Sequence, residues 1–326
     1  MLLTGLCVGS FLNVFGLRLL SEESIAYPPS KCPKCQTPIN WFDNLPVISY
    51  IILGGKCRKC KEHISLQYPT VEAFTGLLYV ALYLAFGFSL QTLFLIILCS
   101  TLIVIAITDF KDQVVYDINS LPLIPLGLIY NFFNIGQNSI KDITIPLEGI
   151  SSSIVLHDVF ISALIGAVLG LIFFEIICLI GYVFVGQRAF GFGDSLISAG
   201  LGAWFGWKLL LVIFILSFIV QAIAGIPIVL WNMYKNKEYK SIACLLGMFS
   251  SILIPYIAQK IGFSNTLSGA LISSISAMIL VLVCTIPVLK AAKERQSYTF
   301  LPFGPALIFG AFVVIFYGDA ILKFYS

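Results

Sequence analysis

The sequence predicts an all-α membrane protein, a polytopic bundle of about 8–10 transmembrane helices with one small zinc-binding loop. Apolar residues make up 59% of the 326 residues and charged residues only 11%, and the mean hydropathy of +0.99 lies far above that of soluble domains. The apolar residues form uninterrupted runs, several of which reach the roughly 20 residues that a helix needs to cross the hydrocarbon core. Outside these runs, the longest hydrophilic stretch carries four cysteines in two close pairs.

Ten apolar runs follow one another, and we expect each to form a helix. The first lacks the basic start and small-residue cleavage site of a signal peptide, so we expect a retained span. The short, glycine-rich run at 190–207 is typical of a tilted or partly re-entrant segment covered by protein. The chain thus divides into a first span (1–20), a hydrophilic loop (21–69) and a bundle (70–326). The runs occupy residues 2–20, 70–88, 90–110, 114–134, 159–186, 190–207, 208–231, 243–261, 268–290 and 300–323.

Lysine and arginine residues concentrate on one side of the predicted membrane. Because basic loops are retained in the cytoplasm, loop 21–69 is expected to be cytoplasmic. Alternation of the spans then places residues 111–113, 187–189, 232–242 and 291–299 on the same side, and residues 135–158 outside. The formal charge of +3 is too small, and the basic residues are too dispersed among loops, to indicate nucleic acid binding.

Two CxxC pairs lie in the hydrophilic loop, Cys32 with Cys35 and Cys57 with Cys60. Each pair can occupy a tight turn, so that four thiolates surround one Zn²⁺ ion at about 2.3 Å. A redox pair or two disulfides are the alternatives, and a reducing cytoplasm disfavours both. Four sulfur ligands leave no position for water, so the predicted zinc is structural and supplies folding free energy to a loop with little core.

Two aspartates lie at matching ends of apolar runs. Asp109 ends the run at 90–110, and Asp194 follows Gly191-Phe192-Gly193. Carboxyl groups in or beside a bilayer are costly, and the predicted topology brings these two to the same membrane face. A facing pair that shares one proton can activate water and polarise a carbonyl group, which is the chemistry of an aspartic peptidase. The alternatives are a solvated carboxylate at a helix end for Asp109 and a helix cap for Asp194. Gly191 and Gly193 would let substrate or a neighbouring helix approach the backbone of the second aspartate.

These residues, in this order, resemble the type IV prepilin peptidase family, in its bifunctional form of leader peptidase and N-methyltransferase. The resemblance covers most of the chain. The matching segments are residues 9–14 with Arg18, the two CxxC pairs, residues 44–50, 64–65 and 68–72, Asp109, and residues 191–194, 202–207 and 302–305.

The resemblance implies a multi-pass enzyme of the bacterial inner membrane whose active site faces the cytoplasm. Asp109 and Asp194 match the catalytic aspartates, which cleave the short basic leader of a prepilin or pseudopilin. S-adenosylmethionine then supplies a methyl group to the new N-terminus, an activity associated with the zinc loop. Asn13, Arg18 and Glu72 are candidates for the substrate or methyl-donor region. Membrane lipid and pilus or type II secretion assembly proteins are further implied partners.

The chain departs from the family pattern at several positions. Tyr116 stands where the family usually has proline, Leu196 where it has lysine, and Arg188 where many members have glutamate. The common plan has about eight spans, so the additional pair near 243–290 is expected to form an inserted helical hairpin. These departures leave both aspartates in place but alter the surroundings in which substrate would bind.

Two other functions stay open from the sequence. One is a peptidase without methyltransferase activity, in which the zinc loop serves only folding or leader recognition. The other is a proton-coupled transporter that uses intramembrane carboxylates as a relay. A transporter would place its acids near the middle of the bilayer, whereas Asp109 and Asp194 map to one end.

Overall fold

The computed structural model describes residues 1–24, 27, 29–133, 135, 153–186, 188, 190–237, 239–251, 256–257, 260, 276 and 302–325. Within these residues the chain is helical and has no β-strand, only two isolated bridges in the cysteine loop. The predicted all-α class is therefore confirmed for the described part. The hairpin expected at 243–290 lies outside the described residues, apart from a portion of α9 (Tyr239–Ser251) and a few single positions.

Six helices in the described ranges are long and apolar enough to cross a membrane, which makes the chain a multi-pass membrane protein. The sequence predicted about 8–10 spans for the whole chain. The six are α1 (Leu2–Leu20), α3 (Gln67–Phe86), α4 (Leu90–Asp112), α7 (Ser153–Val185), α8 (Phe192–Lys235) and α12 (Gly304–Tyr325). The run at 114–134 forms two short helices instead of one, α5 (Asp117–Ser120) and α6 (Leu123–Phe132), which meet at Pro122, a residue without an amide hydrogen.

The chain forms two compact units. The first comprises Met1–Phe174, Gly191–Ser217 and Pro302–Ser326, and the second comprises Glu175–Phe190 and Phe218–Leu301. Every candidate catalytic and metal-binding residue that the sequence predicts lies in the first unit, which is described below.

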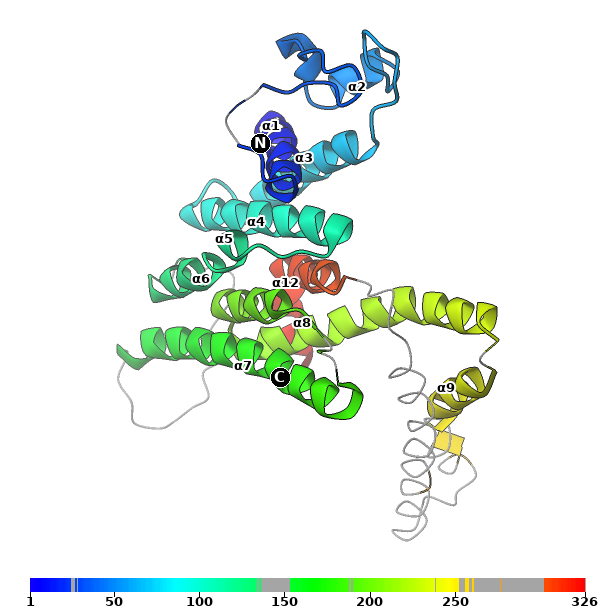
Figure 1. The fold of residues 1–326 in the computed structure, drawn as a ribbon. Helices are drawn as coiled ribbons and strands as arrows, with labels where there is room; N and C mark the ends of the chain where they lie inside the picture. Colours follow the sequence, from blue (N-terminus) through cyan, green and yellow to red (C-terminus); the bar gives the residue numbers. More distant parts are fainter. Residues whose placement is uncertain are drawn as a thin grey trace. The chain divides into compact units, whose positions relative to one another are not determined.

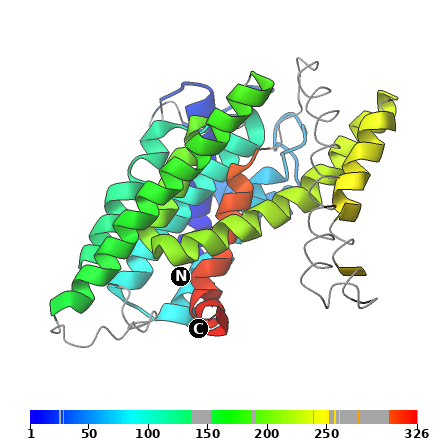
Figure 2. The same cartoon turned by 90° about the horizontal axis from the view of Figure 1, so that it is seen from below.

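Helix α4 is the central element of the first unit. It contacts α1, α3, α5, α6 and α12, and Figure 1 shows it between α1 and α3 on one side and α6 and α12 on the other. Its side chains at Leu98, Leu102 and Ile105 are fully buried. Figure 2 shows the same helices from below. The packing of α4 carries its last turn, with Asp109, into the interior.

Small residues allow the helices to approach closely. A Cβ atom at Gly5 of α1 would lie 2.8 Å from the Cα atom of Gly76 in α3, and one at Gly9 would lie 2.9 Å from that of Glu72. Close backbone approach through glycine is the usual way in which membrane helices gain van der Waals contact, because lipid provides no hydrophobic driving force between them.

Helix α8 reverses direction at Gly206, where φ is 73° and ψ is 172°. Ile197, before the break, lies against Gly304, and Ile213, after it, lies against Gly310 of the same helix α12. In a straight helix Ile197 and Ile213 would be about 24 Å apart, too far to reach neighbouring turns of α12. The break coincides with the boundary between the runs predicted at 190–207 and 208–231.

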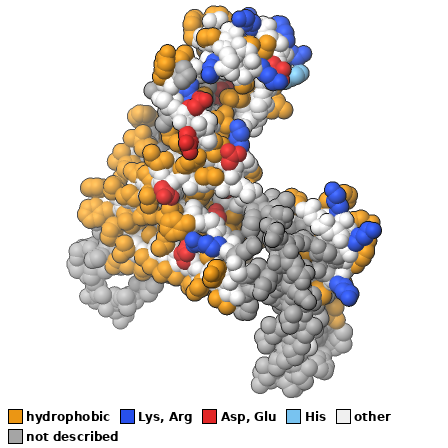
Figure 3. Space-filling view, in the orientation of Figure 1, with side chains coloured by type: hydrophobic (Ala, Val, Ile, Leu, Met, Phe, Trp, Pro, Cys, Tyr) orange, Lys and Arg blue, Asp and Glu red, His pale blue; other side chains and the backbone are white. Residues whose placement is uncertain are grey.

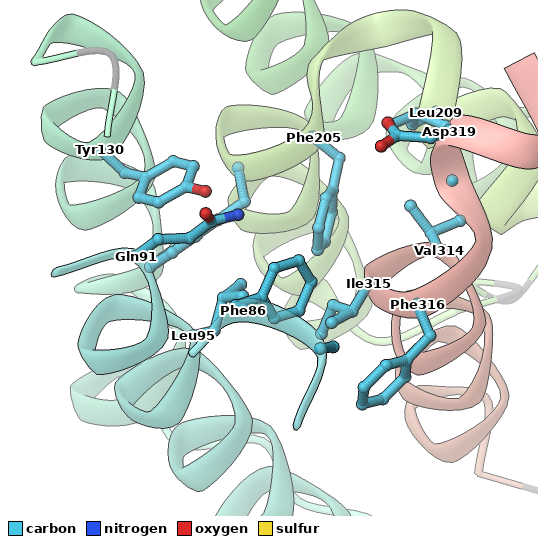
Figure 4. A pocket seen from close by; sticks show the side chains of 13 residues that line it. Phe86, Gln91, Leu95, Tyr130, Phe205, Leu209, Val314, Ile315, Phe316 and Asp319 are labelled. Carbon is cyan, nitrogen blue, oxygen red and sulfur yellow. The ribbon is translucent and has the colours of Figure 1, made fainter. Parts of the chain in front are cut away.

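Apolar side chains cover most of the face of the bundle seen in Figure 3, and lysine and arginine side chains gather at the cysteine loop. The loop contains the 3₁₀ helix η1 (Trp41–Asn44) and the short helix α2 (Ile48–Ile52), which pack against each other. An apolar outer surface is expected where helices face lipid instead of water.

Candidate active site and metal centre

Asp109 lies in the last turn of α4 and is buried. The backbone N–H of Gly304, the first residue of α12, donates a hydrogen bond to its carboxylate. The Oδ2 atom of Asp109 is buried and has no hydrogen-bond partner within the described structure. A buried acceptor of this kind needs a donor from water or a ligand, because leaving it unpaired is costly.

Asp194 lies in the first turn of α8 and is also buried. Its backbone N–H donates to the carbonyl oxygen of Gly191 at 3.2 Å, and the N–H of Gly191 donates to its carboxylate. Asp194 is the third residue of α8, and its carboxylate accepts from the N–H of the residue before the helix, which is one half of a capping box. Gly191 has no side chain to supply the other half, so the helix-cap alternative describes part of the surroundings of Asp194. The cap fixes where the carboxylate sits at the start of α8.

The two aspartates come together at one end of the first unit. The negative charge of Asp109 acts directly on the carboxyl group of Asp194. Gly304 joins their surroundings, since a Cβ atom there would lie 3.3 Å from Cγ of Asp109 and 3.6 Å from Cδ1 of Ile197, one turn beyond Asp194. The like charges disfavour simultaneous ionisation of the two carboxyl groups.

The glycines of the GxGD segment have different surroundings. A Cβ atom at Gly193 would lie 2.9 Å from both γ-carbons of Val115 and closer still to its Cβ, so the loop after α4 packs directly on this backbone. Gly191 has no such neighbour, and the nearest atom is a carboxylate oxygen of Asp194 at 4.0 Å. A side chain at position 193 would therefore clash with Val115, so glycine is required there for steric reasons.

The four loop cysteines form one cluster. Their Sγ atoms all lie within 4.8 Å of one another, and those of Cys32 and Cys60 are 3.8 Å apart. Four sulfurs at about 2.3 Å from a tetrahedral zinc ion would be separated by about 3.8 Å. The donor set therefore fits a zinc ion, and within the described residues this is the cluster of cysteine, histidine and acidic groups that could hold a metal.

Both cysteine pairs occupy the same backbone turn. In the first, the N–H of Cys32 donates to Thr37 and the N–H of Gln36 donates to Cys32, at 3.0 and 2.9 Å. The second repeats this pattern from Cys57, whose N–H donates to Glu62 at 2.8 Å and whose carbonyl accepts from Lys61 at 3.0 Å. Gln36 and Lys61 both have positive φ, 54° and 60°. The loop thus contains an internal structural repeat, and residues 31–39 and 56–64 also share the pattern Lys-Cys-x-Lys-Cys with a final isoleucine.

Hydrogen bonding makes the four thiols unequal. Hydrogen bonds from the side chain and backbone of Thr37 lower the pKa of Cys35 to about 6. Backbone N–H groups of Cys60 and Lys59 lower the pKa of Cys57. The N–H of Glu62 acts to lower the pKa of Cys60, but burial and the three neighbouring thiols outweigh it and raise that pKa to about 11. Hydrogen bonding thus favours the thiolate form of Cys35 and Cys57, whereas burial and the neighbouring thiols disfavour it at Cys60. A bound cation would favour the thiolate form of all four.

The three weaker candidates lie at the same end of α1 and α3. Asn13 Oδ1 accepts a hydrogen bond from Gln67 at 3.0 Å, whereas its Nδ2 is buried without a partner. Glu72 Oε2 accepts from the backbone N–H of Val47 at 2.8 Å. Arg18 donates to the carbonyl oxygen of Ser24 at 2.9 Å. Asn13 and Glu72 are thus buried polar groups between helices, and Arg18 is a half-buried group at the end of α1.

Several relevant contacts gave no signal in the sequence. Asn119 of α5 is buried and its Nδ2 has no partner in the described structure. In the second unit, Arg188 forms an ion pair with Glu175 of α7 at 2.8 Å. The arginine that departs from the family pattern therefore has an acidic partner. The one sequence feature that could have pointed to Asn119 is its position as a polar residue inside the apolar run at 114–134.

Comparison with known proteins gives two matching family models. Residues 3–86 match the bacterial peptidase A24 N-terminal domain, and residues 96–226 match the type IV leader peptidase family. No solved structure matches the chain.

Curated relatives named prepilin leader peptidase/N-methyltransferase are similar over about two thirds of the chain. The Myxococcus xanthus protein is 33% identical over 229 residues, which cover 69% of this chain and 61% of that protein. The Neisseria gonorrhoeae protein is 33% identical over 246 residues, with coverages of 68% and 79%. The Pseudomonas aeruginosa protein is 35% identical over 250 residues, with coverages of 69% and 78%. The chain thus spans less than two thirds of the first of these relatives.

Fold and site together define a multi-pass helical membrane protein that carries two buried aspartates at one end of the first unit and a cluster of four cysteines that could hold a metal ion. The chain belongs to the type IV leader peptidase family, which confirms the resemblance drawn from its motifs.

Proposed function

We propose that this chain removes the leader from prepilins or pseudopilins with Asp109 and Asp194 and then methylates the new N-terminus. The observation that carries the peptidase is the convergence of two buried aspartates at one end of the first unit, with one carboxylate oxygen unpartnered. The names of the relatives support this substrate class.

The proposed hydrolysis needs no covalent intermediate. One carboxylate takes a proton from water, whose oxygen attacks the scissile carbonyl carbon, while the other carboxyl group donates its proton to the carbonyl oxygen. On collapse the C–N bond breaks and the leaving amine takes a proton from the dyad. Gly191 and Gly193 support this geometry by holding the Asp194 turn and admitting Val115 against it.

In the proposed enzyme Cys32, Cys35, Cys57 and Cys60 hold a structural zinc ion. The spacing of their sulfurs supports this assignment. The ion would fix both turns of the loop and would leave no coordination site for water.

S-adenosylmethionine, when bound, supplies the methyl group. Asn13 and Glu72 are proposed to hold it or the substrate, because Asn13 has an unpartnered buried donor and Glu72 a buried carboxylate. A peptidase without methylation is the second candidate, since Glu72 already serves to hold the loop at Val47.

The proposed location is the bacterial inner membrane, with the active site on the cytoplasmic side. The basic loop supports this orientation. Pilus or type II secretion assembly proteins are the proposed partners beyond the substrate.

Co-expression with a prepilin, followed by intact-mass analysis, tests both activities. Cleavage with an added CH₂ unit at the new N-terminus is the expected product. Cleavage without the added mass would leave the peptidase and remove the methyltransferase, and an uncleaved prepilin would contradict the proposal.

A further inference from the structure

The loop helices η1 and α2 present large apolar side chains that no part of the described structure covers. Trp41 is 78% exposed, Ile51 71% and Ile52 73%. Trp41 and Phe42 pack edge to face, and η1 packs on α2, so these side chains belong to one small folded unit. In water such a surface would be unfavourable for so small a loop.

A hydrogen bond sets the depth of this unit relative to the membrane helices. The N–H of Val47, which precedes α2, donates to Glu72 Oε2 at 2.8 Å. Glu72 lies five residues into the membrane-crossing helix α3, about 7.5 Å along its axis from Gln67. A helical side chain leans toward the N-terminus of its helix, so Val47 lies beside the first turns of α3. Helix α2 therefore begins at the level where a membrane span begins.

Basic side chains surround the same unit. Lys56, Lys59 and Lys61 of the second cysteine turn are exposed, and Figure 3 shows lysine and arginine atoms beside apolar atoms on the loop. Arg58 pairs with Asp43 at 2.6 Å and lies over the ring of Phe42, which ties this turn to η1. Exposed aromatic and aliphatic groups next to lysines are the features of segments that bind anionic membrane surfaces.

We propose that η1 and α2 form an interfacial element seated in the headgroup layer of an anionic bilayer. Trp41, Ile51 and Ile52 enter the boundary with the acyl chains, and Lys56, Lys59 and Lys61 contact lipid phosphates. This contact holds the cysteine cluster at the membrane surface, independently of any catalytic role.

Tryptophan fluorescence of the full chain in nanodiscs tests the proposal. The Trp41→Phe variant supplies the difference spectrum, because the other three tryptophans lie in α8. Nanodiscs of phosphatidylcholine with phosphatidylglycerol are compared with matched discs whose lipids carry bromine near the glycerol backbone. The expected result is a blue-shifted Trp41 emission, most of which is lost in the brominated discs.

The loop must keep its fold for this comparison, so zinc content is measured in each sample. A second variant, Lys59→Glu with Lys61→Glu, is expected to lose quenching when phosphatidylglycerol is present. Trp41 emission typical of water, unchanged by brominated lipid in a zinc-loaded sample, would overturn the proposal. Equal quenching in the double lysine variant would remove the assignment of anionic headgroups.

A second inference concerns Asn119, and it rests on the proposed peptidase. Helices α5 and α6 run alongside the first half of α8: Leu123 packs at Gly200, and Gly127 packs at Trp204. Val115 packs at Gly193 on the same line. This register places Asn119 level with residues 194–197, in the turn of α8 that begins with Asp194.

Two buried atoms at this end lack partners and have opposite hydrogen-bonding character. Asn119 Nδ2 is a donor and Asp109 Oδ2 is an acceptor, and among the described residues the third such buried side-chain atom is Asn13 Nδ2. A bound peptide could satisfy both, through a carbonyl oxygen at Asn119 and a water or N–H group at Asp109.

We infer that Asn119 donates a hydrogen bond from Nδ2 to a carbonyl oxygen of the substrate next to the scissile bond. The test is Asn119→Leu, which keeps the volume and removes the unpaired amide. Removing an unpaired buried amide is neutral or favourable for folding. The expected result is an unchanged or higher melting temperature with kcat/KM lowered by about tenfold or more.

Asn131→Leu is the matched control. Asn131 is equally buried, but its Nδ2 donates to the carbonyl oxygens of Gly127, Ala203 and Trp204 at 2.8–3.0 Å. This variant is expected to lose stability. Full kcat/KM in Asn119→Leu, with Asp109→Asn inactive, would overturn the role of Asn119 alone. If Asn119→Leu and Asp109→Asn both retained activity, the proposed dyad itself would be overturned.

Discussion

The backbone of Gly304 lies against the carboxylate of Asp109. Its N–H donates to that carboxylate, and a Cβ atom at position 304 would clash with Oδ2 of Asp109. The start of α12 thus contributes directly to the surroundings of a residue more than half the chain away. Residues 302–305 carry no reactive side chain, and the contact with Asp109 explains why glycine stands at position 304.

The first prediction is that Gly304→Ala displaces the Asp109 carboxylate and lowers leader cleavage by at least about tenfold, because misplacing a reacting group by 1 Å can cost far more. Gly318→Ala on the same helix is the control, since a Cβ atom there meets its neighbours at ordinary distances of 3.4–3.5 Å. Steady-state cleavage of a purified prepilin measures both. Equal activities would show that Asp109 tolerates the methyl group.

A second prediction concerns the contact of Gly193 with Val115. Gly193→Ala is expected to reduce cleavage, because the new methyl group must push the loop after α4 away from Asp194. Adding Val115→Gly removes the obstructing atoms, so the double variant should recover a large part of the lost rate. The measurement is a double-mutant cycle on kcat/KM, and strict additivity of the two losses would contradict a steric cause.

The cysteine cluster should hold one zinc ion per chain. Serine at Cys35 or Cys57 is expected to remove the metal, because three sulfurs and a hydroxyl group bind zinc far more weakly than four thiolates. Elemental analysis of purified protein checks this. Cys7→Ser, an exposed cysteine on α1 outside the cluster, should keep the full metal content. Zinc retained in the Cys35 and Cys57 variants would show that the ion binds elsewhere.

Glu72 should anchor the loop through Val47, whose φ of 61° is unfavourable for a β-branched residue. Glu72→Leu removes the acceptor, so the amide hydrogens of residues 41–52 are expected to exchange faster with solvent. Hydrogen exchange of the full chain measured by mass spectrometry follows this segment. Glu23→Leu, an exposed position, serves as comparison. Unchanged exchange in the Glu72 variant would mean that other contacts hold the loop.

The sequence predicts best what is local. The long apolar runs led to α1, α3, α4 and α12, because length and hydropathy suffice to define a helix in lipid. The CxxC spacing predicted a cluster, because each pair fixes its own turn and two turns complete four ligands. The run at 114–134 was divided into α5 and α6 because Pro122 has no amide hydrogen for a helix to use.

What the sequence does not show are contacts between distant segments. No spacing rule connects Gly304 to Asp109 or Val47 to Glu72. None predicts that α5 and α6 pack along the first half of α8. These depend on which helix faces neighbour in the bundle. For Asp109 and Asp194, by contrast, alternation of the spans alone predicts a common membrane face.

The most direct measurement is cleavage of a purified prepilin by Asp109→Asn and by Asp194→Asn in reconstituted membranes. Asp112→Asn is the matched control, an exposed aspartate in the same last turn of α4. Both dyad variants should fold, bind zinc as the unaltered chain does and release no leader, while the control cleaves at the normal rate. Leader release at the normal rate by either dyad variant would contradict the assignment of this pair as the catalytic centre.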